Sequence, residues 1–371
     1  MDIGNIKKLN KYHVIFLTQN VLIGIGLFSL PHDISALGYN LWLLPLIYGV
    51  IANITLIPIL ALSKKYPDQS LYSINEKLVG KYIGKGLNVL LIFFAIVHTS
   101  SVCHSYVRVL QTVSYPDETI LISSLSLYVV LVLIVLGGIK SVARFCIFSF
   151  FITGWMVYFV KWAFQQGELM HAVPTLEHDL SIWLSTLHSG AGVMFGYVLV
   201  LFYFPYIQEQ KKAFRHMTIG IWIAVTFYVV VCLASVVYFS TWQQANLVLP
   251  ILNLFQSVQL PLVERIENFG VSLWVFLVLS TASAYLWVAK KGVDALFSNY
   301  KDKPWHVYPV AFISIMLFLG PLSVDIQEFI FGDINTYSEY AVIVLPVFLL
   351  FIHWLKSKLK KEGNHENTHQ A

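Results

Sequence analysis

Charged residues are rare in this chain of 371 residues. Asp, Glu, Lys and Arg make up 12% of it, against about 25% in soluble domains, whereas 57% of the residues are hydrophobic. So few polar groups cannot cover the surface of a water-soluble particle, and no polar linker is long enough to separate several soluble domains. The sequence therefore predicts a single all-α domain embedded in a membrane.

Cysteines are few, and the motifs of enzymes and metal sites are missing. The three cysteines lie far apart in apolar runs and form no CxxC pair, which argues against a disulfide framework and predicts buried thiols: Cys103, Cys146 and Cys232. No nucleophile–base–acid triad, phosphate-binding loop or HExxH motif is present. We therefore expect no enzyme, no cofactor and no metal.

Ten apolar runs are long enough to cross a bilayer. They lie near residues 12–35, 39–62, 86–113, 119–138, 142–165, 186–206, 214–240, 263–289, 306–323 and 338–356. We expect one transmembrane domain over residues 1–357 and a polar cytoplasmic tail over 358–371. Ten spans divide into two halves of opposite orientation, residues 1–165 and 186–357.

Basic residues mark one side of the predicted membrane. If both termini are cytoplasmic, the inner segments hold 21 of the 24 lysines and arginines. The outer loops then hold no basic residue and carry acids, among which we count Glu177 and Glu339. This is the positive-inside pattern. The basic loops indicate topology and contact with anionic lipid rather than binding of nucleic acid.

The first span contains Gly24-Ile25-Gly26, and Pro31 follows. Two glycines weaken the helical ladder at a depth where freed backbone groups need partners. We predict an unwound segment over Gly24, Ile25, Gly26 and Leu27, whose N–H groups face a ligand carboxylate and whose carbonyls face an ammonium. The alternative is close helix packing through small residues.

The sixth span is interrupted in a similar way, by Ser189-Gly190-Ala191-Gly192. We predict a second broken segment at Gly190 and Gly192, with Phe195 or Tyr197 covering the ligand. An ordinary packing face remains the alternative. Interruptions at corresponding places in two halves are typical of inverted-repeat transporters, whose site lies near the bilayer midplane.

Polar side chains cluster inside the third and eighth spans. At such depth they suggest a ligand-binding wall, whereas hydroxyls bonded to their own backbone are the alternative. The candidates are His98, Thr99, Ser101, Ser280, Thr281 and Tyr285.

Four further charged residues are candidates for structure or gating. Glu264, Arg265 and Glu267 open the eighth span. Glu264 and Glu267 are either first-turn acids that cap the helix or part of an ion-pair lock with another span, for which Arg108 and Lys161 are candidates. The alternative for Arg108 is a side chain that reaches outward to the interface.

The sequence resembles the spore germination protein family of amino-acid permease type, the B subunits of germinant receptors. The resemblance covers nearly the whole chain. The motifs that carry it are Gly24-Ile25-Gly26-Leu27 with Leu30-Pro31, Phe195-Gly196-Tyr197 with Phe204-Pro205-Tyr206 and Lys211-Lys212, and, most specifically, Pro250-Ile251-Leu252-Asn253-Leu254-Phe255-Gln256 followed by Glu264-Arg265-Ile266-Glu267-Asn268-Phe269.

This resemblance implies a LeuT-like fold of ten helices in the amino acid–polyamine–organocation class. It also implies a nutrient germinant, typically an amino acid, bound between the first, third, sixth and eighth spans, and A-type and C-type partner subunits in the spore inner membrane. Members of the family usually carry a Glu directly after the glycine–aromatic pair of the sixth span, where this chain has Val198. The alternatives are an autonomous amino-acid transporter and a channel or scaffold without its own ligand.

Overall fold

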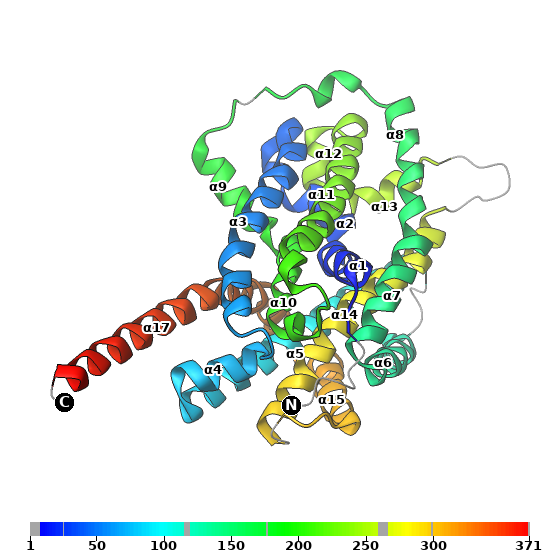
Figure 1. Cartoon of the computed structure of the whole chain (residues 1–371). Coiled ribbons are helices and arrows are strands. Elements are labelled where there is room, and N and C mark those ends of the chain that lie inside the picture. Colours follow the sequence, from blue (N-terminus) through cyan, green and yellow to red (C-terminus); the bar gives the residue numbers. More distant parts are fainter. Residues whose placement is uncertain are drawn as a thin grey trace.

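The computed structural model describes residues 8–24, 26–114, 119–175, 177–258, 266–297 and 300–369, with side chains to Leu359 (Figure 1). Nearly all of this part of the chain is helical. One isolated parallel bridge joins Leu9 to Ile207, where the Leu9 N–H donates to Tyr206 O (2.7 Å) and the Gln208 N–H donates to Leu9 O (2.9 Å). The bridge ties the segment before the first span to the end of the sixth.

Helices and short helical turns follow one another along the chain. In the first half they are α1 (Lys11–Ile23), α2 (Gly26–Asp33), η2 (Ser35–Leu43), α3 (Leu44–Lys65), α4 (Leu71–Val79), α5 (Lys81–Ser114), α6 (Ile120–Leu136), α7 (Gly138–Thr153), η3 (Gly154–Val160), α8 (Lys161–Gln166) and η4 (Leu169–Ala172). In the second half they are α9 (Leu180–Ser189), η5 (Ala191–Met194), η6 (Gly196–Leu199), α10 (Val200–Tyr203), η7 (Phe204–Tyr206), η8 (Gln210–Lys212), α11 (Ala213–Tyr238), α12 (Thr241–Asn246), α13 (Pro250–Phe255), α14 (Ile266–Phe297), η9 (Pro304–His306), α15 (Val307–Leu319), α16 (Val324–Glu328), η10 (Phe329–Ile334) and α17 (Asn335–His369).

Six helical segments of the described chain are long and apolar enough to cross a membrane, and the bent pair α1–α2 makes a seventh. The six are Ser35–Lys65, Lys81–Ser114, Gly138–Gln166, Gln210–Tyr238, Ile266–Phe297 and Val324–Leu359. Three shorter apolar helices, Ile120–Leu136, Gly196–Tyr206 and Pro304–Leu319, coincide with the remaining predicted runs. The finding confirms a helical membrane protein, and the count of ten spans stays a prediction.

The helix α14 lies at the centre of the bundle. Of its apolar window, 78% is buried inside the protein, against 22% for the segment Val324–Leu359 that contains α17. It packs against α5, α6, α7 and α1, whereas the C-terminal part of α17 projects away from the other helices (Figure 1). α14 therefore contributes side chains to the interior of the bundle.

The outer helices present apolar side chains to their surroundings. On α6, Ile122, Leu125, Val129 and Leu133 are exposed at helical spacing. A stripe of this kind has no polar cover and suits contact with lipid tails. The same face would be unstable in water, which agrees with the membrane placement that the composition predicts.

Candidate ligand site at two broken helices

The first span is broken where its glycines predict. α1 ends at Ile23, α2 begins at Gly26, and the two helices are bent by 48°. Ile25 lies outside the described residues, and Leu27 is half-buried in the first turn of α2. Because the ladder stops here, the last carbonyls of α1 lose their helical donors and need others.

Side chains of two distant helices supply those donors. The Tyr228 hydroxyl of α11 reaches Leu22 O (2.7 Å) and Ile23 O (3.3 Å). From α14, the Trp274 indole donates to Gly24 O (2.9 Å). Of the carbonyls predicted to face a ligand ammonium, that of Gly24 is thus already bonded to protein.

Thr281 and Ser280 of α14 bond to the last turns of α1. The Thr281 hydroxyl donates to Asn20 O (2.9 Å), and the Ser280 hydroxyl donates to Asn20 Oδ1 (3.0 Å). A Cβ on Gly24 would lie 3.6 Å from Thr281 Oγ1. The structure therefore brings these three predicted residues together, with the hydroxyls fixing the broken helix.

The sixth span is broken over a longer stretch. α9 ends at Ser189, and the chain continues through the short turns η5 and η6 before α10. Gly196 needs to be glycine because a Cβ there would lie 2.3 Å from Val21 O, so this turn approaches the backbone of α1. Gly190 is buried against Ile34, while Gly192 is exposed with open space around it.

The predicted aromatic residues of the sixth span are both buried. The Tyr197 hydroxyl bonds to the Thr55 hydroxyl of α3. The Phe195 ring lies edge-on to Tyr340 of α17, with ring centroids 5.0 Å apart. These contacts link the second break to the second and tenth predicted spans.

In α5, His98 lies at a junction with two other helices. Its ring stacks on Tyr285 of α14 (centroids 4.7 Å apart, interplanar angle 20°), and its Nε2 lies 2.6 Å from Glu339 Oε1 of α17. Glu339 is 2% exposed, so its placement in an outer loop is wrong. Sequence reasoning missed this acid as a site residue, although it falls inside the last apolar run, where an ionisable residue is itself a signal.

The other predicted polar residues have plainer surroundings. The buried Thr99 hydroxyl bonds to Ala95 O of its own helix (2.8 Å), and Ser101 is half-buried. Arg108 is exposed and bonds to His104 (3.2 Å), as an outward-reaching side chain does. Glu267 is buried in the first turn of α14. Glu264 and Arg265 lie outside the described residues, so the proposed lock stays a prediction.

A second cluster of charges surrounds the C-terminal end of α14. Asp294 is 1% exposed and binds Lys290 (2.7 Å) and His306 Nδ1 (2.7 Å). Lys290 also binds Asp302. Burial raises the pKa of Asp302, but the hydrogen bond from Lys290 and the charge of Lys291 outweigh it, so this pKa is lowered. The sequence predicts only a basic loop here, because its acids are separated along the chain.

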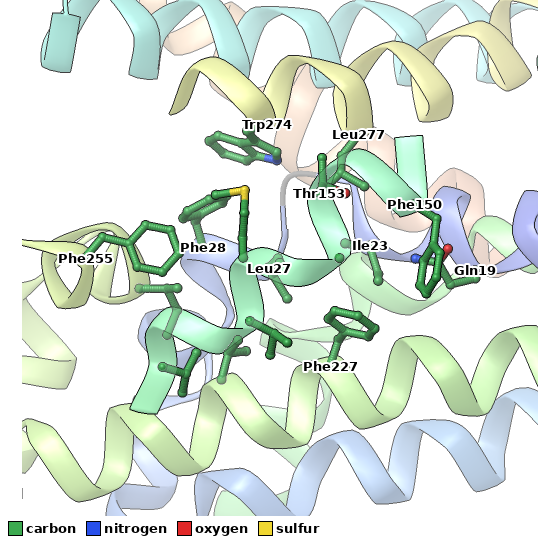
Figure 2. Close-up of a pocket in the computed structure, with 16 residues that line it drawn as sticks. Gln19, Ile23, Leu27, Phe28, Phe150, Thr153, Phe227, Phe255, Trp274 and Leu277 are labelled. Carbon is green, nitrogen blue, oxygen red and sulfur yellow. The ribbon is translucent and has the colours of Figure 1, made fainter. Parts of the chain in front are cut away.

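An apolar cavity of about 40 Å³ lies beside the first break (Figure 2). Rings of Phe28, Phe255, Trp274, Phe150 and Phe227 surround it, and its polar lining comes from Gln19 and Thr153. Small-molecule pockets measure roughly 300 Å³ or more. The cavity is therefore too small for an amino acid in this conformation, and of the predicted ligand residues that the structure describes only Leu27 lines it.

Comparison with known proteins agrees with this geometry. The model of a protein family described as "Spore germination protein" matches residues 8–324. Spore germination protein GerQB of Bacillus cereus is 24% identical over 95% of this chain and 98% of its own length. Spore germination proteins B2 and A2 of Bacillus subtilis (strain 168) are each 22% identical over 95% of this chain and 97% of theirs.

Two solved transporters share the fold. The crystal structure of MhsT in complex with L-phenylalanine superposes with a TM-score of 0.67 at 14% identity, covering 90% of this chain and 88% of MhsT. Mhp1, a nucleobase-cation-symport-1 family transporter in a closed conformation, gives 0.62 at 12% identity over 87% of this chain and 75% of its own. At this identity the likeness shows a LeuT-like fold and nothing about the ligand.

Proposed function

The chain belongs to the spore germination protein family, and from this premise we propose that it is the B-type subunit of a nutrient germinant receptor. The family and its transporter-like fold make it a multi-pass membrane protein and not an enzyme. As a receptor subunit it would bind a small nutrient, most simply an amino acid, and trigger germination together with A-type and C-type partner subunits in the spore inner membrane.

The proposed architecture is a 5+5 inverted repeat of ten spans with both termini cytoplasmic. The bent pair α1–α2, six long segments and three shorter apolar helices supply ten candidate crossings among the described residues. The basic residues gathered in alternate loops support the orientation. In this arrangement the two broken helices occupy equivalent places in the two halves.

The observation that carries the proposal is that the two breaks touch. A Cβ on Gly26 of α2 would lie 2.0 Å from Val193 Cγ1 of η5. The proposed ligand pocket therefore lies where the first and sixth spans meet, with His98 and Tyr285 from the third and eighth on its far wall. Irregular backbone at this depth is found where it lines a cavity or a ligand site.

A ligand-driven change of conformation is the proposed mechanism. The nutrient would shift the population of the protein toward a second conformation. It can do so only because it binds that state more tightly. The partner subunits would then respond to the changed helices. Val198 is fully buried, so this position of the sixth span offers no charge for ion coupling.

Germination of a deletion strain tests the proposal. Spores that lack the gene should lose their response to at least one member of a panel of amino acids and sugars, and the gene in trans should restore it. The purified subunit in nanodiscs should bind the same nutrient. An unchanged nutrient response would refute the receptor role, and absence of binding at millimolar nutrient would support a scaffold.

The shared fold favours one other function, an autonomous amino-acid transporter. MhsT, whose solved complex contains L-phenylalanine, has the same fold. Purified protein in liposomes separates the two functions. Concentrative uptake of a labelled amino acid without partner subunits would favour the transporter, whereas binding without uptake favours the receptor.

A further inference from the structure

The first turns of α17 hold a buried acid whose bonding fixes one proton. Glu339 Oε1 lies 2.6 Å from His98 Nε2, and His98 Nδ1 lies 3.0 Å from Phe94 O. A carbonyl only accepts, so Nδ1 carries a hydrogen. The contact between Nε2 and Oε1 then needs a second hydrogen, on either atom. In both arrangements the His98–Glu339 pair has no net charge.

The other carboxyl oxygen of Glu339 is the only carboxyl oxygen among ten buried side-chain atoms of the described residues that lack a hydrogen-bond partner. Oε2 is buried and has no hydrogen-bond partner among the described residues. Buried polar atoms almost always have a partner, and an exception needs an explanation such as a missing ligand or water. The carbonyls of Leu22, Gly24 and Asn20 near the break of the first span already accept hydrogen bonds, from Tyr228, Trp274 and Thr281 respectively.

Three of the residues around Glu339 are ones that the sequence assigns to the ligand: His98, Tyr197 and Tyr285. The His98 ring stacks on Tyr285. Tyr197, Tyr285 and Tyr340 are the titratable neighbours that, besides His98, interact electrostatically with Glu339. The acid thus lies between the third, sixth, eighth and tenth predicted spans, with one oxygen free.

The next residue connects this acid to the second break. Tyr340 contacts the Phe195 ring (5.0 Å), and its hydroxyl lies 3.0 Å from His188 Nδ1 of α9. The segment η5, which touches Gly26, also contacts α17. A ligand group held by Glu339 is therefore next to the part of the sixth span that faces the first break.

We propose that Glu339 Oε2 binds the ammonium group of a zwitterionic amino acid. This assignment rests on the proposed function and names the chemical class of its ligand. Oε2 has no hydrogen-bond donor as a partner, and the N–H groups of an ammonium can serve as donors to it. Since the His98–Glu339 pair is neutral, a free amine or an inorganic cation would leave a net charge in a buried site, which is costly. A zwitterion adds none, so amino acids are preferred over amines.

Binding to the purified protein in nanodiscs tests the assignment. A panel of amino acids and sugars identifies the active nutrient. Its des-amino analogue, its decarboxylated amine, ammonium chloride and potassium chloride are then compared with it. In the wild type we expect both analogues to bind about 10- to 100-fold more weakly, as for loss of a hydrogen bond to a charged group. Glu339→Gln should weaken amino-acid binding by a similar factor. The variant should then bind the amino acid and its des-amino analogue with similar affinity.

Glu328→Gln is the matched control, because Glu328 is an exposed acid in α16, eleven residues before Glu339. It should bind like the wild type. If an amino acid binds the wild type and Glu339→Gln equally, the ammonium subsite is wrong while the receptor function stands. If the active nutrient has no amino group, the ammonium subsite is likewise wrong while the receptor function stands. Glu339-dependent binding of ammonium or potassium ions alone replaces the assignment with an inorganic cation site.

Two further results separate the remaining cases. If neither amino acids nor sugars bind the wild type, the proposed function fails together with the subsite. If Glu339→Gln does not accumulate in the membrane, the wild-type ligand series still decides, because a des-amino analogue that binds as tightly as its amino acid overturns the assignment.

Discussion

The backbone of Gly26 lies directly against the side chain of Val193, so that a Cβ on residue 26 would be 2.0 Å from Val193 Cγ1 and 2.6 Å from Val193 Cβ. This contact joins the break of the first span to that of the sixth. Residue 26 cannot gain a side chain unless the two broken segments separate or Val193 moves, since packed interiors do not absorb such overlaps.

Gly26→Ala should therefore weaken the nutrient response. Overpacking costs about 1–3 kcal/mol, which the protein relieves by moving α2 away from η5. We expect a higher half-maximal nutrient concentration in germination assays at normal membrane abundance, and a larger effect for Gly26→Val. Val193→Gly in the same chain removes the overlapping atoms and should restore much of the response.

Gly192→Ala is the control for this series. Gly192 lies in the same break, but no atom comes within 4 Å of its added Cβ. A normal response of the Gly26→Ala spores, or equal losses for positions 26 and 192, would contradict the role of the Gly26–Val193 contact.

The Tyr228 hydroxyl should stabilise the broken end of α1. Tyr228→Phe leaves the carbonyls of Leu22 and Ile23 without this donor, and an unsatisfied buried acceptor costs about 1–3 kcal/mol. We expect a lower apparent midpoint of thermal unfolding in detergent. Thr226→Val on the same helix is the matched control, because the Thr226 hydroxyl bonds only to Trp222 O of its own helix. Equal midpoints for the two variants would refute the assignment.

The positions of both breaks could be predicted from sequence because their cause is local. Gly24 and Gly26 weaken a helix wherever it packs, and Gly190 and Gly192 do the same in the sixth span. The helices themselves could be predicted from the apolar runs, because length and composition are also local properties and decide which segments suit a bilayer.

The partners of those breaks could not be predicted, because they come from elsewhere in the chain. Nothing in the periodicity of α11 or α14 indicates that Tyr228 and Trp274 bond to the end of α1. Glu339 was assigned to a loop since it lies at the edge of an apolar run, and only the packing of α17 on α5 places it beside His98. Charge counting likewise treated Lys290 as a topology signal, whereas its environment is set by Asp294 and Asp302.

Asp294, in the buried charge cluster at the C-terminal end of α14, should contribute to the free energy of unfolding. Asp294→Asn removes a charge that binds Lys290 and His306 at 2.7 Å each. Lys290 keeps Asp302 as a partner, so the loss should be smaller than the about 3–5 kcal/mol of a buried cation left wholly unpaired. We expect a clear fall in the apparent unfolding midpoint of the purified protein. Glu209→Gln is the control, because the Glu209–Lys212 pair has the same 2.7 Å contact at an exposed position. A midpoint for Asp294→Asn that matches this control would show the cluster to be dispensable.

The orientation in the membrane can be tested with single added cysteines, because the three native thiols are free and buried. A membrane-impermeant maleimide should leave the wild type unlabelled on intact cells that express the protein. Glu177→Cys, exposed in the predicted outer loop, should then be labelled, whereas Lys81→Cys, exposed in a predicted inner segment, should react only after the membrane is permeabilised. Both residues lie outside the apolar core, so the two variants differ in the side of the membrane and not in burial. Labelling of Lys81→Cys on intact cells would invert the topology and, with it, the side from which a nutrient reaches the two breaks.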